Sequence, residues 1–190
     1  MLKKGKIIAY ILWTVVLICL ITAYIINPEI ASPKYIVAFI REFNTEMMLI
    51  YILLTLVRGF FLIPSTPFVI GGGLLFPDNL FLVLLISMIG VMLSATTLYY
   101  FSDILGFSKY LEKKFPNKIS TWKSRLKSPK STAFVTAWSF FPFVPTDLIC
   151  YVSGIVKIPF KNMFIGVFIG ELILDIFYVY FGASLFEMIL

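Results

Sequence analysis

The stretch that decides the fold occurs twice, as IPSTP at residues 63–67 and as FPFVPTD at residues 141–147. Each copy is a P-x-x-P step inside an apolar run, and glycine follows it. Proline removes a backbone donor and stops a helix, whereas glycine permits tight bends and close backbone approach. We therefore predict two breaks in apolar helical segments, marked by Pro64, Pro67, Gly71, Gly72 and Gly73 and by Pro142, Pro145 and Gly154.

The composition restricts the class of protein. Of the 190 residues, 60% are apolar and 14% are charged, and the mean hydropathy is +0.97. A soluble domain of this length could not bury so much apolar surface, so we predict an all-α polytopic membrane protein. The chain has no histidine, and Cys19 and Cys150 lie in apolar runs, so we expect no metal, no cofactor and no disulfide framework. In a membrane protein, a net charge of +6 bears on the orientation of the chain in the bilayer and on contact with anionic lipid, rather than on nucleic-acid binding.

Three apolar runs are long enough to cross a bilayer as helices, at residues 7–26, 80–101 and 163–185. Lysines precede the first run, and no small-residue cleavage site follows it, so we expect a retained helix with a cytoplasmic N-terminus. The connection at residues 27–46 has no basic excess, which is typical of an external loop. We expect an integral multi-pass protein of a bacterial-type plasma membrane.

The basic segment at residues 107–130 decides the predicted topology. If the interrupted runs 47–76 and 131–157 both crossed completely, this segment would lie outside, against the positive-inside rule. If each run enters and returns on one side, the segment is cytoplasmic. We therefore expect about three full transmembrane helices plus two opposed re-entrant helical hairpins. Apolar residues recur in the basic segment every three or four positions, so it is either a helix on the membrane surface or a solvated loop.

The two halves of the chain repeat the same landmarks in the same order. The second P-x-x-P corresponds to the first, Pro159 to Pro77, and Gly170 to Gly90. Each half consists of a broken hairpin and then a spanning helix, and the halves enter from opposite faces, as in the inverted repeats of many transporters. We divide the chain into an N-terminal helix and loop (1–46) and one domain (47–190), which comprises repeat 47–106, basic loop 107–130 and repeat 131–190.

Residues 64–76 (PSTPFVIGGGLLF) and 142–154 (PFVPTDLICYVSG), with Pro159 and Gly170 beyond them, resemble the two motifs of the DedA superfamily. This superfamily is also called the VTT-domain or SNARE-associated Golgi protein family. The resemblance implies two facing re-entrant hairpins. It also implies lipid handling, in which members scramble phospholipids or move undecaprenyl phosphate, some of them with a proton gradient.

Two departures from the family pattern bear on the chemistry. Many members carry an arginine three residues before the second P-x-x-P, where this chain has Ser139. Bacterial members of the narrower DedA branch often have an acid beside the first proline pair, where this chain has Ser65 and Thr66. These differences favour the broader VTT branch and weaken the transfer of a phosphate clamp or a proton-relay acid.

Four charged residues at membrane depth are the candidate substrate or proton pathway, because such charges usually face a cavity or one another. Asp147 either couples protons and orients a headgroup or caps the returning half-helix. Arg58 either binds a lipid phosphate or extends to the interface. Glu171 and Asp175 lie one helical turn apart, and they either relay protons or pair with Arg58.

The function that these features favour is a membrane lipid transporter or scramblase. It would move the anionic headgroup of a phospholipid or polyprenyl phosphate across the bilayer. Coupling of this movement to a proton gradient is a further expectation. The alternative is a non-transporting scaffold that binds lipid or partners through its basic amphipathic loop. We predict that the protein is not an enzyme, because no nucleophile–base pair can be recognised.

Overall fold

The computed structural model describes residues 15–16, 18–20, 22–61, 63–104, 130–142 and 144–189. The described residues form helices and no strand, so the prediction of an all-α protein is confirmed. In the described part of the chain, four elements are short 3-10 helices: η1 (Pro28–Ala31), η2 (Asn44–Glu46), η3 (Arg58–Phe61) and η4 (Pro77–Asn79). The α-helices are α2 (Pro33–Arg41), α3 (Met47–Val57), α4 (Thr66–Leu75), α5 (Leu80–Ile104), α8 (Lys130–Ser139), α9 (Thr146–Val156) and α10 (Phe160–Ile189).

Among the described residues, two segments are long and apolar enough to cross a membrane, namely Pro77–Phe101 around α5 and Phe160–Gly182 within α10. Large apolar side chains cover the outer faces of both helices, including Phe81, Ile89 and Phe177. Such faces suit a surrounding of acyl chains. Half of the predicted first span, and the basic segment at residues 107–130 apart from Lys130, lie outside the described residues.

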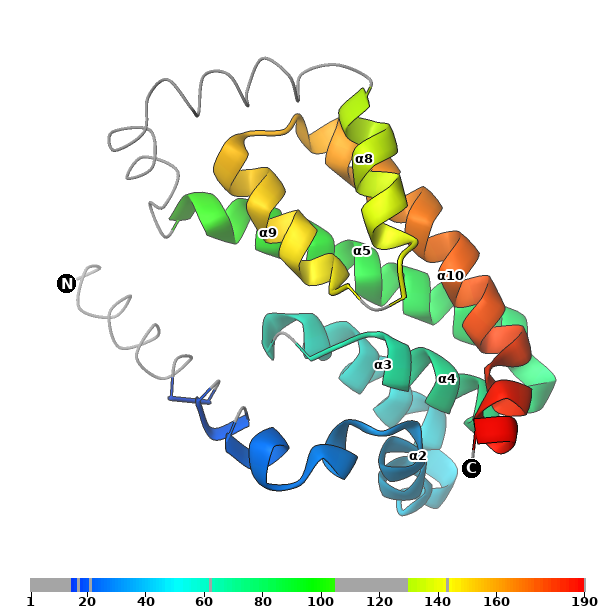
Figure 1. The fold of residues 1–190 in the computed structure, drawn as a ribbon. Coiled ribbons are helices and arrows are strands. Elements are labelled where there is room, and N and C mark those ends of the chain that lie inside the picture. The colour runs from blue at the N-terminus through cyan, green and yellow to red at the C-terminus, as the bar shows by residue number, and fades with distance from the viewer. Residues whose placement is uncertain are drawn as a thin grey trace.

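Two helical hairpins accompany these long helices (Figure 1). In the first, α3 and η3 lead to the tip and α4 returns; in the second, α8 leads to the tip and α9 returns. Pro67 lies in the first turn of α4 and Pro145 is the N-cap of α9, because proline is tolerated only where a helix begins. Legs of about ten residues reach roughly 15 Å, which is half the hydrocarbon core.

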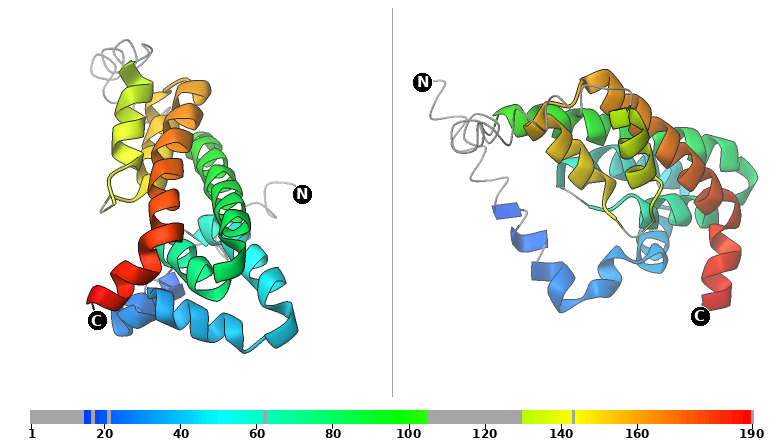
Figure 2. Two further views of the ribbon diagram at one scale, coloured as in Figure 1. Left: turned by 90° about the vertical axis from the view of Figure 1, so that its right-hand side faces the viewer. Right: turned by 45° about the horizontal axis from the view of Figure 1, so that its top comes forward.

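Each hairpin divides its two legs between the two long helices. The descending legs pack within their own half, α3 against α5 and α8 against α10. The returning legs pack against the long helix of the other half, α4 against α10 and α9 against α5. The left view of Figure 2 shows the α8–α9 hairpin at one end of the α5–α10 pair and the α3–α4 hairpin at the other.

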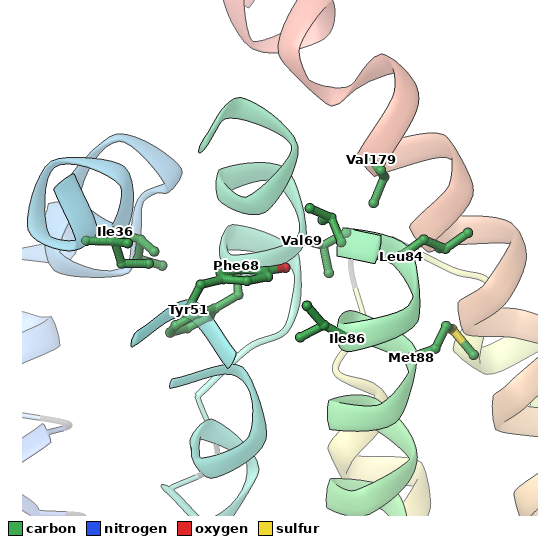
Figure 3. Close-up of a cluster of buried hydrophobic side chains, with 10 residues drawn as sticks. Ile36, Tyr51, Phe68, Val69, Leu84, Ile86, Met88 and Val179 are labelled. Carbon is green, nitrogen blue, oxygen red and sulfur yellow. The ribbon is translucent and has the colours of Figure 1, made fainter. Parts of the chain in front are cut away.

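The crossed packing forms two apolar clusters. In the first, Phe68 and Val69 of α4 lie between Tyr51 of α3 and Val179 of α10 (Figure 3). The amphipathic helix α2 covers this cluster with Ile36 and Ile40. In the second cluster, residues of α9 contact α5, α8 and α10; it contains Val91, Ala95, Leu98, Val135, Ile149, Cys150, Ile158, Met163 and Val167.

Equivalent glycines hold the two descending legs. A Cβ atom on Gly90 of α5 would lie 2.7 Å from the Thr55 carbonyl oxygen of α3. A Cβ atom on Gly170 of α10 would lie 2.7 Å from the Thr136 carbonyl oxygen of α8. No real Cβ tolerates such a distance, so only glycine permits the helices to approach this closely. Each long helix thus holds its descending leg by the same kind of contact; α3, α4 and α5 are called the first unit below, and α8, α9 and α10 the second.

Candidate functional site

The tips of the two hairpins line one cavity of about 660 Å³. The lining comes from both tips and from α5, α9 and α10: Pro64, Ser65, Thr66, Leu98, Phe101, Pro142, Val144, Pro145, Thr146, Asp147, Leu148, Tyr151, Glu171 and Leu174. Helices α4 and α9 both begin at the cavity, so their N-terminal ends contribute partial positive charge there. Most of the lining surface is apolar, and a small set of polar groups converges on the cavity.

Asp147 faces this cavity from the first turn of α9. The N-cap of α9 is Pro145, and no side chain caps the helix, so the interpretation of Asp147 as a capping residue is wrong. Within the described part of the chain, Asp147 has no hydrogen bond or ion pair. Its carboxylate is thus available to a group inside the cavity.

Glu171 and Asp175 lie one turn apart on α10 and are 2% and 1% exposed. The Thr146 hydroxyl, at the start of α9, donates a hydrogen bond to Oε1 of Glu171. Glu171 lines the cavity, whereas Asp175 does not, and Oδ2 of Asp175 has no hydrogen-bond partner among the described residues. Thr146 was not among the predicted site residues, although a hydroxyl beside Asp147 in an apolar run was a usable signal.

Arg58 is 3% exposed, so the prediction that it extends to the interface is wrong. Its Nη1 donates to the Ile63 carbonyl oxygen at 3.0 Å, and its Nε has no partner among the described residues. Arg58 interacts electrostatically with Asp147, Glu171 and Asp175, yet it forms no ion pair with any of them in the residues described. It also does not line the cavity.

Arg58 and Ser139 occupy equivalent positions in the two units. Arg58 follows Thr55 by three residues and Ser139 follows Thr136 by three, and these threonine carbonyls face the equivalent glycines of α5 and α10. Ser139 is fully buried and its hydroxyl has no partner among the described residues. The chain therefore carries its arginine in the first unit, at the place where the second unit has serine.

The hairpin glycines serve packing rather than the cavity surface. Gly71, Gly72, Gly73 and Gly154 are buried, and none lines the cavity. A Cβ on Gly73 would lie 2.9 Å from the Val179 carbonyl oxygen, so this glycine permits the contact of α4 with α10. Of the tip prolines, Pro64, Pro142 and Pro145 line the cavity and Pro67 does not.

Several cavity residues were not predicted as site residues. Ser65 and Thr66 were noted only as departures from an acidic motif, and both line the cavity. Phe101 and Tyr151 add two aromatic rings to the lining. Among the described residues, no group of three histidine, cysteine, aspartate or glutamate side chains could hold a metal ion.

Comparison with known proteins gives one match. Residues 63–184, most of the chain, match the family model described as the VTT domain. No curated protein and no solved structure matches the chain. The matched region begins at the first hairpin tip and ends in α10, so it contains both tips, all the cavity-lining residues and two of the three buried charges.

Proposed function

The chain belongs to the VTT domain family, and we propose that it is a lipid transporter or scramblase of the cell membrane. The lipid headgroup, that of a phospholipid or polyprenyl phosphate, crosses through the cavity between the two hairpin tips. The acyl chains stay in the bilayer. The observation that carries the proposal is the convergence of both broken hairpins on one cavity, which Asp147 and the buried Glu171 also line.

The geometry suits a headgroup better than a free polar solute. The cavity wall is mainly apolar, with polar groups gathered at the hairpin tips. The N-terminal ends of α4 and α9 would face a phosphate with partial positive charge, and Ser65 and Thr66 offer hydroxyl groups. Transport needs no covalent step, so no catalytic residue is assigned. Glu171 and Asp175 are the candidates for proton coupling, because buried carboxyl groups can exchange protons.

The proposed topology follows from the distribution of lysine and arginine. The N-terminus and the basic segment at residues 107–130 lie in the cytoplasm, and the hairpins are re-entrant from opposite faces. Single cysteines placed at Lys118 and Lys127 would react with an impermeant thiol reagent only from the cytoplasmic side. Labelling from outside intact cells would overturn this arrangement.

Reconstitution tests the transport proposal. The protein is placed in liposomes with labelled phospholipid or labelled polyprenyl phosphate, with and without a pH gradient, and the lipid that changes leaflet is measured. We expect movement well above that of empty liposomes, and less with Asp147→Asn or Arg58→Ala. Lipid binding without movement under any of these conditions would favour the scaffold alternative and reject transport.

A further inference from the structure

We propose that the cavity selects phospholipids whose headgroup carries an ammonium group, and that Asp147 and Glu171 receive that group. This inference rests on the proposed function and narrows its substrate. Among the described residues that line the cavity, the charged side chains are these two acids and no base. An anionic headgroup alone would meet carboxylates without a compensating cation in the wall, which costs free energy in a medium of low dielectric constant.

Both acids offer free oxygen atoms to a ligand. Glu171 is 2% exposed, lines the cavity and receives one hydrogen bond, from Thr146 to Oε1, so no described residue satisfies Oε2. Asp147 receives no hydrogen bond from the described residues. These oxygen atoms are not among the buried unsatisfied atoms of the described residues, so a ligand in the cavity can reach them. A primary ammonium group supplies three donors and the missing positive charge. The two acids lie on α10 and α9, so the ligand would join these helices.

Arg58 does not supply the missing charge at the cavity surface. It lies outside the lining and donates Nη1 to the Ile63 carbonyl oxygen. With Asp175 behind Glu171, the described cluster holds three carboxyl groups against one guanidinium. Carboxyl groups this deeply buried ionise at a cost in free energy unless a cation lies beside them; an ammonium group supplies that cation, whereas a polyprenyl phosphate does not. The charge balance therefore favours zwitterionic phospholipids over purely anionic lipids.

The remaining lining complements the two ends of a zwitterionic headgroup. Phe101 and Tyr151 present aromatic rings, which attract alkylammonium groups electrostatically. Ser65 and Thr66 lie on the other hairpin tip, where α4 begins, and can donate hydrogen bonds to the phosphate. Ammonium and phosphate would thus be held by different tips.

Direct binding tests the inference without requiring transport. The purified full-length protein in detergent is titrated with short-chain phosphatidylethanolamine, phosphatidylcholine, phosphatidylglycerol and phosphatidic acid. We expect phosphatidylethanolamine to bind about tenfold more tightly than the two anionic lipids, since one charge-assisted hydrogen bond is worth about that much. Phosphatidylcholine, whose trimethylammonium group has no N–H to donate, should bind more tightly than the anionic lipids but less tightly than phosphatidylethanolamine. Asp147→Asn and Glu171→Gln, made separately, should each reduce this preference, and Asp78→Asn, at an exposed acid outside the cavity, should not.

Three results would overturn the inference. One is equal or tighter binding of phosphatidylglycerol by the wild-type protein, which needs no variant to fold. Another is a preference for ammonium lipids that both substitutions leave intact. The third is binding of free phosphoethanolamine as tight as that of the lipid, because the ligand would then be a soluble amine.

The proposed function and this inference fail in different ways. In liposomes, acyl-labelled phosphatidylethanolamine should move faster than acyl-labelled phosphatidylglycerol. If both move equally and bind equally, the selectivity is wrong and transport stands. If neither moves but the ammonium lipid still binds preferentially, transport is wrong and the cavity assignment stands.

Discussion

The two units share a scaffold but differ in their charges. Both fix a descending leg to a long helix through a glycine and a threonine carbonyl. The first unit places Arg58 after that contact, and the second unit places Ser139 at the same position. The second unit instead supplies the acids Asp147, Glu171 and Asp175. A repeated scaffold therefore does not form two similar sites; each unit contributes one sign of charge to one electrostatic cluster, of which only Asp147 and Glu171 line the cavity.

The largest expected effect comes from removing the cation of the first unit. Arg58→Gln leaves the three acids without their nearest positive charge, so lipid movement in liposomes should fall about tenfold or more. The free energy of unfolding should fall by about 3 kcal/mol, the usual order for one partner of a buried charge cluster. Thermal unfolding in detergent measures the second effect.

The equivalent position in the second unit provides the control. Ser139→Ala removes a hydroxyl that has no partner among the described residues, so stability and transport should stay close to wild type. Adding Asp175→Asn to Arg58→Gln should recover part of the lost stability by restoring the charge balance. If Arg58→Gln and Ser139→Ala reduce stability and transport equally, the charge of Arg58 does not contribute to either.

The shared scaffold should respond equally in both units. Gly90→Ala and Gly170→Ala each force a Cβ against a carbonyl oxygen, and we expect each to lower the free energy of unfolding by about 1–3 kcal/mol. Gly71→Ala is the matched control, because its Cβ would meet side-chain atoms at an ordinary 3.6 Å. That change should be neutral or slightly stabilising, as alanine favours a helix. A large loss from one of the two glycines alone would contradict the equivalence of the units.

The smallest expected effect tests the contact between the second tip and α10. Thr146→Val removes the hydroxyl that donates to Glu171, so the free energy of unfolding should fall by about 1–2 kcal/mol. Thr97→Val serves as control, because the Thr97 hydroxyl bonds only to Leu93, one turn back in its own helix, at 2.8 Å. No difference between the two variants would mean that the Thr146 hydroxyl does not support Glu171.

Local sequence signals predicted the breaks in the helices and the two long apolar helices. Proline interrupts a helix through its own ring, so the breaks at Pro67 and Pro145 could be predicted. An uninterrupted apolar run of about twenty residues has the length of a membrane-spanning helix, so the spans around α5 and α10 could be predicted as well. The crossing of α4 and α9 to the other unit could not. These short helices are apolar on most sides, and periodicity does not say which long helix covers them.

The equivalence of Arg58 and Ser139 also could not be predicted from the sequence. Arg58 precedes Pro64 by six residues, whereas Ser139 precedes Pro142 by three, so alignment on the prolines separates the two positions. The short helix η3 (Arg58–Phe61) takes up the extra residues in the first unit. Burial of Arg58 was missed for a related reason, because a long cationic side chain near a predicted helix end could equally have reached the interface.

The crossed packing of the returning legs has a consequence for how the chain is made. Helix α4 ends at Leu75 and packs on α2, which precedes it, but its further partner α10 begins only at Phe160, so one side of α4 is synthesised long before the helix that covers it. The second hairpin finds its partner α5 already present. Contacts between segments so distant along the chain form late. We therefore expect lipid or an insertion factor to shield that side of α4 until α10 leaves the ribosome.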